Sequence, residues 1–192
     1  RVSGDPKALY QEVILDHNKK PRNWGKIADA THRAEGLNPL CGDHIWLSLK
    51  LDDGKIGGIA FEGESCAICK ASSSMMTTNV KGKSIEEAER LIRECRDMST
   101  GNLDTASQPN HLGRLSVFAG VSDLPTRVKC AILPWHTLHA AFNSGGRTST
   151  EAEDDPVHAP IGNTRRVIFF CHGAHRGFSA GALLPGSRCV IR

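Results

Sequence analysis

The sequence predicts an α+β domain in which a three-stranded, mainly antiparallel sheet packs with helices. In the first half of the chain, a segment that alternates apolar and polar residues is joined by the turn pair Asp53-Gly54 to a second segment that is expected to return beside it. Much of the stretch from Cys66 to Phe142 instead repeats its apolar residues at helical spacing. A chain of 192 residues is long enough to bury a core of its own. We therefore expect one domain over residues 1–142.

The first predicted helix begins at Asp5-Pro6, because Asp caps helix N-termini and Pro is favoured at the first helical position. Residues that share its apolar face follow: Tyr10, Val13, Ile14 and His17. Pro21 and Gly25 are expected to end it. In the strand over residues 45–51 apolar side chains alternate with polar ones, and "KIGGIAFEG" is expected to return beside it.

Helices dominate the second half of the domain. The stretch "AICKASSSMMTTNVKG" predicts a helix that ends at Gly82, and the capping box of Ser84 and Glu87 begins the next one. "RLSVFAGVSDLP" predicts a short helix and turn. The closing helix covers residues 127–142, where Pro134 either kinks the helix or marks its first turn.

The segment from Asn143 to Arg192 differs in composition from the rest of the chain. It is rich in Gly, Pro and charged residues and has no apolar periodicity over most of its length. We predict a tail over residues 143–192 that is mostly disordered, and either a lineage extension or a frameshifted reading.

The composition argues against several classes of protein. A net charge of +3, with six Phe, three Trp and one Tyr, does not suggest a nucleic-acid-binding protein. No apolar run is long enough to predict a membrane span. Seven scattered Cys do not form the even set of a secreted disulfide framework, so we expect reduced thiols and a cytoplasmic location. In such proteins Cys clusters more often bind metal or take part in catalysis.

The motif "CGD" places two metal-ligand side chains two residues apart. Cys41 and Asp43 point to the same side of an extended chain, and Gly42 between them allows a close approach to a ligand. Taken alone, however, the pair is better explained as a buried Cys followed by a turn Asp, because free Cys is among the most buried residue types.

A C-x-x-C formed by Cys66 and Cys69 follows at the junction of a predicted strand and helix. This spacing is compatible with half of a zinc site, with a dithiol redox pair, or with no function. No second C-x-x-C or H-x(3–5)-H completes a zinc knuckle, and the preceding hairpin does not match a thioredoxin-type βαβ unit. The H-x-E and P-C-x-x-C motifs of zinc deaminases are absent from the sequence too. Cys66 alone would have its thiolate favoured by the helix N-terminus, with Ser65 as the expected N-cap.

A third thiol, Cys130, opens the possibility of a four-ligand site. If it meets Cys41, Asp43 and Cys66, the four form an S3O set suited to Zn²⁺ with a net charge of minus two. Such a charge needs cations nearby, for which the candidates are Arg127, Lys129 and Lys70. Spacing alone leaves this convergence a hypothesis.

The ordered combination of "CGD", "SCAICKASSSMM" and "RVKCAILPW" resembles the three-cysteine pattern of the IscU/NifU N-terminal family. The opening "LYQEVILDHNKKPRNWG" is similar to that family's first helix and loop, and the resemblance covers roughly residues 8–142. Scaffold-type IscU proteins carry a His before the third Cys, whereas this chain has Lys129. Together with the long spacing from Cys66 to Cys130, this resembles the SufU branch.

The resemblance implies a SufE/IscU-like fold and a zinc site built from Cys41, Asp43, Cys66 and Cys130. It also implies that Cys41 accepts sulfur from a PLP-dependent cysteine desulfurase of the SufS type, once a partner's His replaces it on the metal, and passes it towards a downstream cluster-assembly scaffold. Arg127 is expected to support Cys41 as a cation. Two alternatives remain open, a scaffold that binds a [2Fe–2S] cluster on the same ligands and a zinc-stabilised interaction module without chemistry.

The other singled-out residues are expected to have structural roles. Cys69 is predicted to be a bystander, because the family commonly has a small residue there. Cys95 is expected in the core, and three histidines are expected to pack, cap or lie at the surface: His17, His136 and His139. The tail residues that could chelate metal adventitiously are assigned no role: Cys171, His172, His175 and Cys189.

Overall fold

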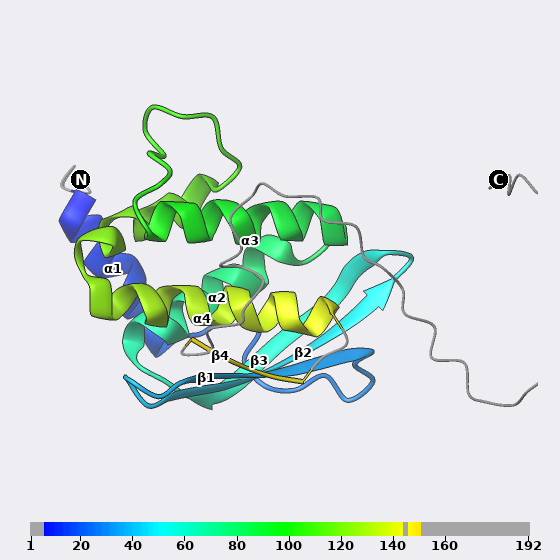
Figure 1. Ribbon diagram of the computed structural model, residues 1–192. Coiled ribbons are helices and arrows are strands. Elements are labelled where there is room, and N and C mark those ends of the chain that lie inside the picture. Colours follow the sequence, from blue (N-terminus) through cyan, green and yellow to red (C-terminus); the bar gives the residue numbers. More distant parts are fainter. Residues whose placement is uncertain (1–5, 144–145, 151–192) are drawn as a thin grey trace, which may run out of the picture. The chain divides into compact units, whose positions relative to one another are not determined.

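The computed structural model describes residues 6–143 and 146–150, and the predicted tail beyond Thr150 lies outside them. The elements follow in the order α1 (Pro6–Lys19), β1 (His32–Asn38), β2 (Asp43–Asp52), β3 (Lys55–Glu64), α2 (Ala67–Val80), α3 (Ile85–Ser99), η1 (Gly113–Asp123), α4 (Pro125–Phe142) and β4 (Gly146–Ser149). Figure 1 shows the α-helices on one side of the sheet. The α+β class is therefore confirmed.

The sheet contains four strands in the order β3-β2-β1-β4, so the predicted count of three was wrong. Strands β1, β2 and β3 pair antiparallel, as predicted for the hairpin, whereas β4 pairs parallel to β1. Strand β4 reads Gly-Arg-Thr-Ser, and its side chains are exposed or half-buried at the edge of the sheet. It therefore lacks the apolar alternation by which a half-buried strand is recognised.

The sequence analysis also did not locate strand β1, for a different reason. Its inward-facing residues are Ala34, Gly36 and Asn38, all buried and none of them a large apolar side chain. Small residues are needed here because α4 lies close above: a Cβ on Gly36 would overlap the Thr137 hydroxyl and press on Leu133. This close approach fixes α4 over β1.

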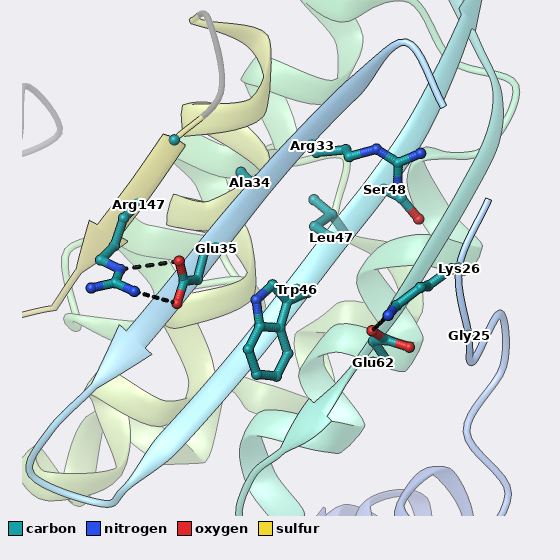
Figure 2. Close-up of a pocket in the computed structure, with 11 residues that line it drawn as sticks. Gly25, Lys26, Arg33, Ala34, Glu35, Trp46, Leu47, Ser48, Glu62 and Arg147 are labelled. Atoms are coloured by element: carbon teal, nitrogen blue, oxygen red, sulfur yellow. Dashed lines mark hydrogen bonds and ion pairs between the residues drawn. The ribbon is translucent and has the colours of Figure 1, made fainter. Parts of the chain in front are cut away.

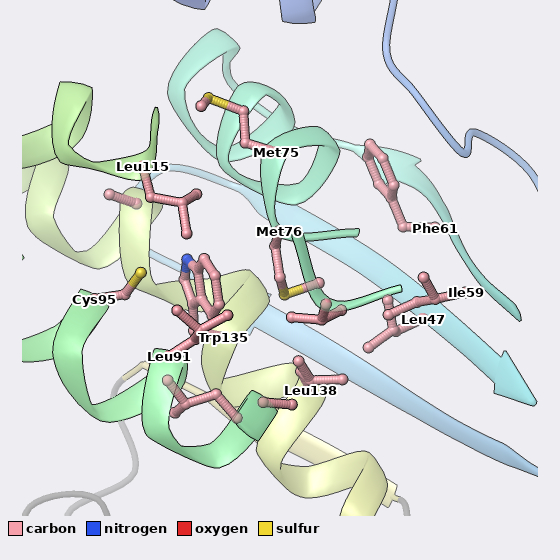
Figure 3. Close-up of a cluster of buried hydrophobic side chains, with 14 of the residues drawn as sticks. Leu47, Ile59, Phe61, Met75, Met76, Leu91, Cys95, Leu115, Trp135 and Leu138 are labelled. Atoms are coloured by element: carbon pink, nitrogen blue, oxygen red, sulfur yellow. The ribbon is translucent and has the colours of Figure 1, made fainter. Parts of the chain in front are cut away.

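The core fills the layer between the sheet and the helices (Figure 3). Leu47, Ile59 and Phe61 project into it from β2 and β3, and Trp135 meets them from α4. Cys95 lies in this cluster with 2% of its surface exposed, as expected for a core residue.

The predicted helix boundaries agree closely with those observed. The capping box of α3 is present, since the Ser84 hydroxyl accepts from the Glu87 amide and the Glu87 carboxylate accepts from the Ser84 amide. Pro134 lies inside α4, so it does not mark that helix's first turn. Across the described residues, no helix is long and apolar enough to span a membrane.

Candidate metal centre

Four segments converge at one end of the sheet. Cys41 lies in the turn between β1 and β2, and Asp43 is the first residue of β2. Cys66 is the N-cap of α2, and Cys130 lies in the second turn of α4. The four predicted site residues, which are 89 positions apart at the extremes, are thus brought together by the hairpin and two helix starts.

The donor atoms lie at distances typical of a shared metal site. The sulfur atoms of Cys41 and Cys130 are 3.1 Å apart, and both lie within 4.8 Å of an Asp43 carboxylate oxygen. The Cys66 sulfur is 3.9 Å from Asp43 Oδ2. Two thiolates bound tetrahedrally to one zinc ion lie roughly 3.8 Å apart, so only small shifts would be needed.

The turn before β2 sets the positions of Cys41 and Asp43. The Cys41 amide donates to the Asn38 carbonyl at 3.3 Å, which closes the turn. Gly42 has a φ of +70°, a left-handed conformation that favours glycine. Cys41 remains half-buried, whereas Asp43 and Cys130 are buried. Cys41 is therefore more accessible to solvent than Cys130.

The start of α2 holds Cys66 in place. Its amide donates to Asp43 Oδ1 at 2.7 Å, and its sulfur accepts from the Cys69 amide at 3.4 Å. The N-cap is Cys66 itself, so the prediction of Ser65 as N-cap was wrong by one residue. A sulfur at this position is stabilised as a thiolate by the partial positive charge of the helix N-terminus.

The protonation of the thiols differs in the metal-free site. A hydrogen bond with Cys130 lowers the pKa of Cys66 to about 7, and the Cys69 amide adds to this shift against the effect of burial. For Cys130, the hydrogen bond with Cys66 and burial both raise the pKa of the thiol far above its usual range. Of these two thiols, Cys66 therefore loses its proton more readily than Cys130.

Arg127, one of the three predicted cations, lies beside the thiols. Nη1 of Arg127 is 3.9 Å from the Cys41 sulfur. A hydrogen bond with Cys130 and the neighbouring sulfur charges raise the pKa of Arg127. Lys70 instead lies over the Trp24 ring, with Nζ 5.2 Å from the ring centre, and Lys129 is half-buried on α4.

Asn38 is a site residue that the sequence analysis missed. It is fully buried, and its Nδ2 donates to Asp43 Oδ2 at 3.1 Å and to the Cys130 sulfur at 3.3 Å. A contact of this kind with metal ligands fixes their orientation. Its only signal in the sequence is a polar residue at an inward strand position, next to Pro39.

The remaining singled-out residues that the structure describes have structural roles, and of these Cys69 packs directly beside the donors. Cys69 is fully buried in α2, and burial raises the pKa of its thiol well above the usual range. His17 contacts the Ser74 hydroxyl at 2.8 Å, and His139 pairs with Glu89 at 2.8 Å. His136 is buried, so it packs rather than lying at the surface. The expectation that these histidines pack or cap is thus met.

The Ser72 hydroxyl links helix α2, which carries Cys66, to helix α4, which carries Cys130. Ser72 on α2 donates to the Ala131 carbonyl at 2.6 Å and accepts from Trp135 Nε1 at 3.2 Å. The first of these partners, Ala131, directly follows Cys130 along α4. A buried hydrogen-bonded link thus joins the two helices that carry Cys66 and Cys130.

The donor set fits zinc. The donor atoms of Cys41, Asp43 and Cys130 lie within 4.8 Å of one another, and the Cys66 sulfur approaches this group at Asp43. Three thiols and a carboxylate are a donor set that suits four-coordinate Zn²⁺. The same sulfur-rich set is also compatible with an iron–sulfur cluster, which Cys thiolates hold. The donor chemistry therefore restricts the ligand to thiophilic metals without choosing between these two.

The chain is similar to proteins of iron–sulfur cluster assembly. The family model described as "NifU-like N terminal domain" matches residues 9–131. A protein from Bacillus subtilis named "Zinc-dependent sulfurtransferase SufU" is 43% identical over 140 residues, which are 72% of this chain and 93% of that protein. A Streptococcus pyogenes protein named "Iron-sulfur cluster assembly scaffold protein IscU" is also 43% identical, over 70% of this chain and 82% of its own length.

Solved structures show the same fold. A Fervidobacterium islandicum protein described as a putative scaffold for the SUF system is 37% identical, with a TM-score of 0.63 over 68% of this chain and 93% of that one. A NifU-like N-terminal structure from Brucella abortus has a TM-score of 0.64 at 24% identity and covers 70% of this chain and 92% of its own, a likeness that concerns the fold alone.

Proposed function

The chain belongs to the NifU-like N-terminal domain family, and we propose that it accepts and transfers sulfur for iron–sulfur cluster assembly in a zinc-dependent manner. The observation that carries this proposal is the meeting of Cys41, Cys66 and Cys130 with Asp43, where the half-buried Cys41 lies beside Arg127. The expected sulfur donor is a PLP-dependent cysteine desulfurase. A cluster-assembly scaffold is the expected recipient, and the cytoplasm the expected location.

Zinc would be held by the four donors, with Asn38 orienting two of them. Bound zinc keeps coordinating thiolates deprotonated and moderates their nucleophilicity. The chain's own contribution is to bury Asp43 and Cys130 while it leaves Cys41 near the surface. The guanidinium of Arg127 stabilises negative charge on the Cys41 sulfur when that sulfur reacts.

The transfer step is a thiol–persulfide exchange. The Cys41 thiolate attacks the terminal sulfur of a persulfide on the donor's Cys, and its electron pair forms the new S–S bond. The S–S bond in the donor breaks, and its electron pair leaves on the donor's thiolate. Cys41 then carries the persulfide, and the exchange consumes neither oxidant nor reductant.

A cluster scaffold is the second candidate function, because it would use the same ligands and the similar Streptococcus protein carries that name. Lys129 favours transfer, since scaffold-type relatives are expected to have His before the third Cys. Metal content separates the two candidates. Colourless protein with one tightly held zinc supports transfer, whereas a brown iron-bearing species formed anaerobically supports the scaffold.

The experiment that tests the proposal is a stimulation assay with a SufS-type cysteine desulfurase. We expect the wild-type protein to raise the rate at which the desulfurase turns over cysteine, and Cys41→Ala to abolish this effect while remaining folded. Cys69→Ser is the control, because it also removes a thiol next to the metal centre, at the start of α2, but one outside the donor set. Full stimulation by folded Cys41→Ala would defeat the proposed transfer.

A further inference from the structure

Strand β4 lies outside the residues 9–131 that the family model matches, yet it reaches the metal centre. It runs parallel to β1, with Gly146 opposite Ala34 and Ser149 opposite Leu37. Since β1 ends at Asn38, the chain that leaves β4 arrives beside the buried amide that contacts Asp43 and Cys130.

Two contacts hold this segment in register. The Arg147 guanidinium forms a two-pronged ion pair with Glu35 of β1, at 2.9 and 3.0 Å (Figure 2). One residue past the strand, the Thr150 amide donates to the Leu37 carbonyl at 3.0 Å. The Thr150 hydroxyl is thereby fixed at the end of β1, and it donates to Asn38 Oδ1 at 3.2 Å.

We propose that Thr150 and Asn38 are positioning residues for the metal centre, linked as a relay from the edge strand to the ligands. The Thr150 hydroxyl donates to Oδ1 of the Asn38 amide, so Nδ2 of Asn38 faces Asp43 and Cys130. Asp43 as a carboxylate only accepts hydrogen bonds, so the reverse orientation of the amide would set oxygen against oxygen. The inference rests on the metal site of the proposed function.

The relay acts through ligand geometry. Groups that hydrogen-bond to metal ligands typically change metal affinity by roughly 10–100-fold when they are removed. Without the hydroxyl, the buried Asn38 oxygen would lose its partner, and the amide would be free to turn away from Asp43 and Cys130. Metal affinity, measured without any partner protein, therefore reports directly on the relay.

The test is zinc competition with a chromophoric chelator on the full-length chain. Thr150→Val keeps the shape of the side chain and removes the hydroxyl, so we expect zinc to bind about tenfold more weakly. Thr150→Ser keeps the hydroxyl donor, so this variant should bind zinc like the wild type. Thr148→Val makes the same chemical change on β4 itself and should leave affinity unchanged.

A double-mutant cycle distinguishes an effect that acts through Asn38 from a general destabilisation of the sheet edge at β4. In an Asn38→Ala background, Thr150→Val should cause no further loss of zinc affinity, because its only route to the ligands is gone. Additive losses, wild-type affinity in Thr150→Val, or equal weakening by Thr148→Val would each overturn the inference. A protein that binds zinc through this relay but accepts no sulfur would instead refute the proposed function alone.

Discussion

The three thiols of the candidate metal centre sit in different surroundings. Cys130 is buried within α4, Cys66 caps α2 with its sulfur facing the Cys69 amide, and Cys41 lies on a turn that solvent reaches. A reactive sulfur must be accessible to a partner, whereas an anchoring sulfur gains from burial. Cys41 and Cys66 are both half-buried, so accessibility sets only Cys130 apart, and the contact with Arg127 distinguishes Cys41 from Cys66. Under the proposed function, Cys41 is therefore the acceptor and the other two thiols hold the metal.

The C-x-x-C pair provides a prediction at the residue scale. Cys66→Ser should lose more zinc affinity than the roughly 10–100-fold expected for a contact beyond the ligands, because it removes a ligand itself, and sulfur acceptance should fall with it. Cys69→Ser should keep both properties. It places a hydroxyl at a fully buried position, so it should lower the free energy of unfolding by about 1–3 kcal/mol.

Zinc titration and thermal unfolding of the two variants check this prediction. Equal loss of zinc in both variants would mean that the C-x-x-C acts as a pair, against the assignment of Cys69 as a bystander.

Sequence reasoning found the four donors because each stands in a short motif, and the order of the motifs resembled a known family. It did not find Asn38 or Thr150. Their contact joins residues 112 positions apart, and neither residue type indicates a metal site by itself. A partner of metal ligands is recognised only when its own neighbours are known, which requires the packed structure.

At the scale of elements, the site depends on how closely α4 lies over β1. Gly36 permits this approach, since a Cβ there would overlap the Thr137 hydroxyl. Strand β1 ends in Asn38, and α4 carries Cys130, which Asn38 contacts at 3.3 Å. A change in the spacing of these two elements therefore separates groups of the metal centre.

Gly36→Ala tests this dependence. Overpacking should lower the free energy of unfolding by about 1–3 kcal/mol and should weaken zinc binding as α4 moves away from β1. Gly120→Ala is the matched control, because an added Cβ there has no atom within 4 Å, and it should change stability by less than about 0.5 kcal/mol. Urea unfolding of the metal-free protein and zinc competition measure both effects. Unchanged zinc affinity in a destabilised Gly36→Ala would show that the site tolerates the shift.

The elements differed in how well the sequence predicted them. The hairpin and the helices were predicted because burial imposes period-two and helical spacing on their apolar residues. Strands β1 and β4 carry no such pattern, since β1 faces α4 with small residues and β4 lies at the sheet edge. Their pairing depends on tertiary contacts: the close approach at Gly36 and the Arg147–Glu35 ion pair.

At the scale of the whole molecule, the described residues form the fold of the family, and β4 leads a further contact to the metal centre. The hairpin, α2 and α4 bring the four donors together, and the edge strand β4 adds Thr150 behind them. Each donor is fixed by a neighbour from a different part of the chain. Under the proposed function, three of the donors stay in place while the half-buried Cys41 reacts.

The central claim is that Cys41 is the sulfur acceptor. The most direct measurement is mass spectrometry of peptides after the zinc-loaded protein has been incubated with a cysteine desulfurase and cysteine, without reductant. The account predicts one additional sulfur atom on the peptide that contains Cys41, and no additional sulfur on any peptide of Cys41→Ala. Additional sulfur on the Cys66 or Cys130 peptide instead, or on no peptide while the desulfurase itself carries a persulfide, would contradict it.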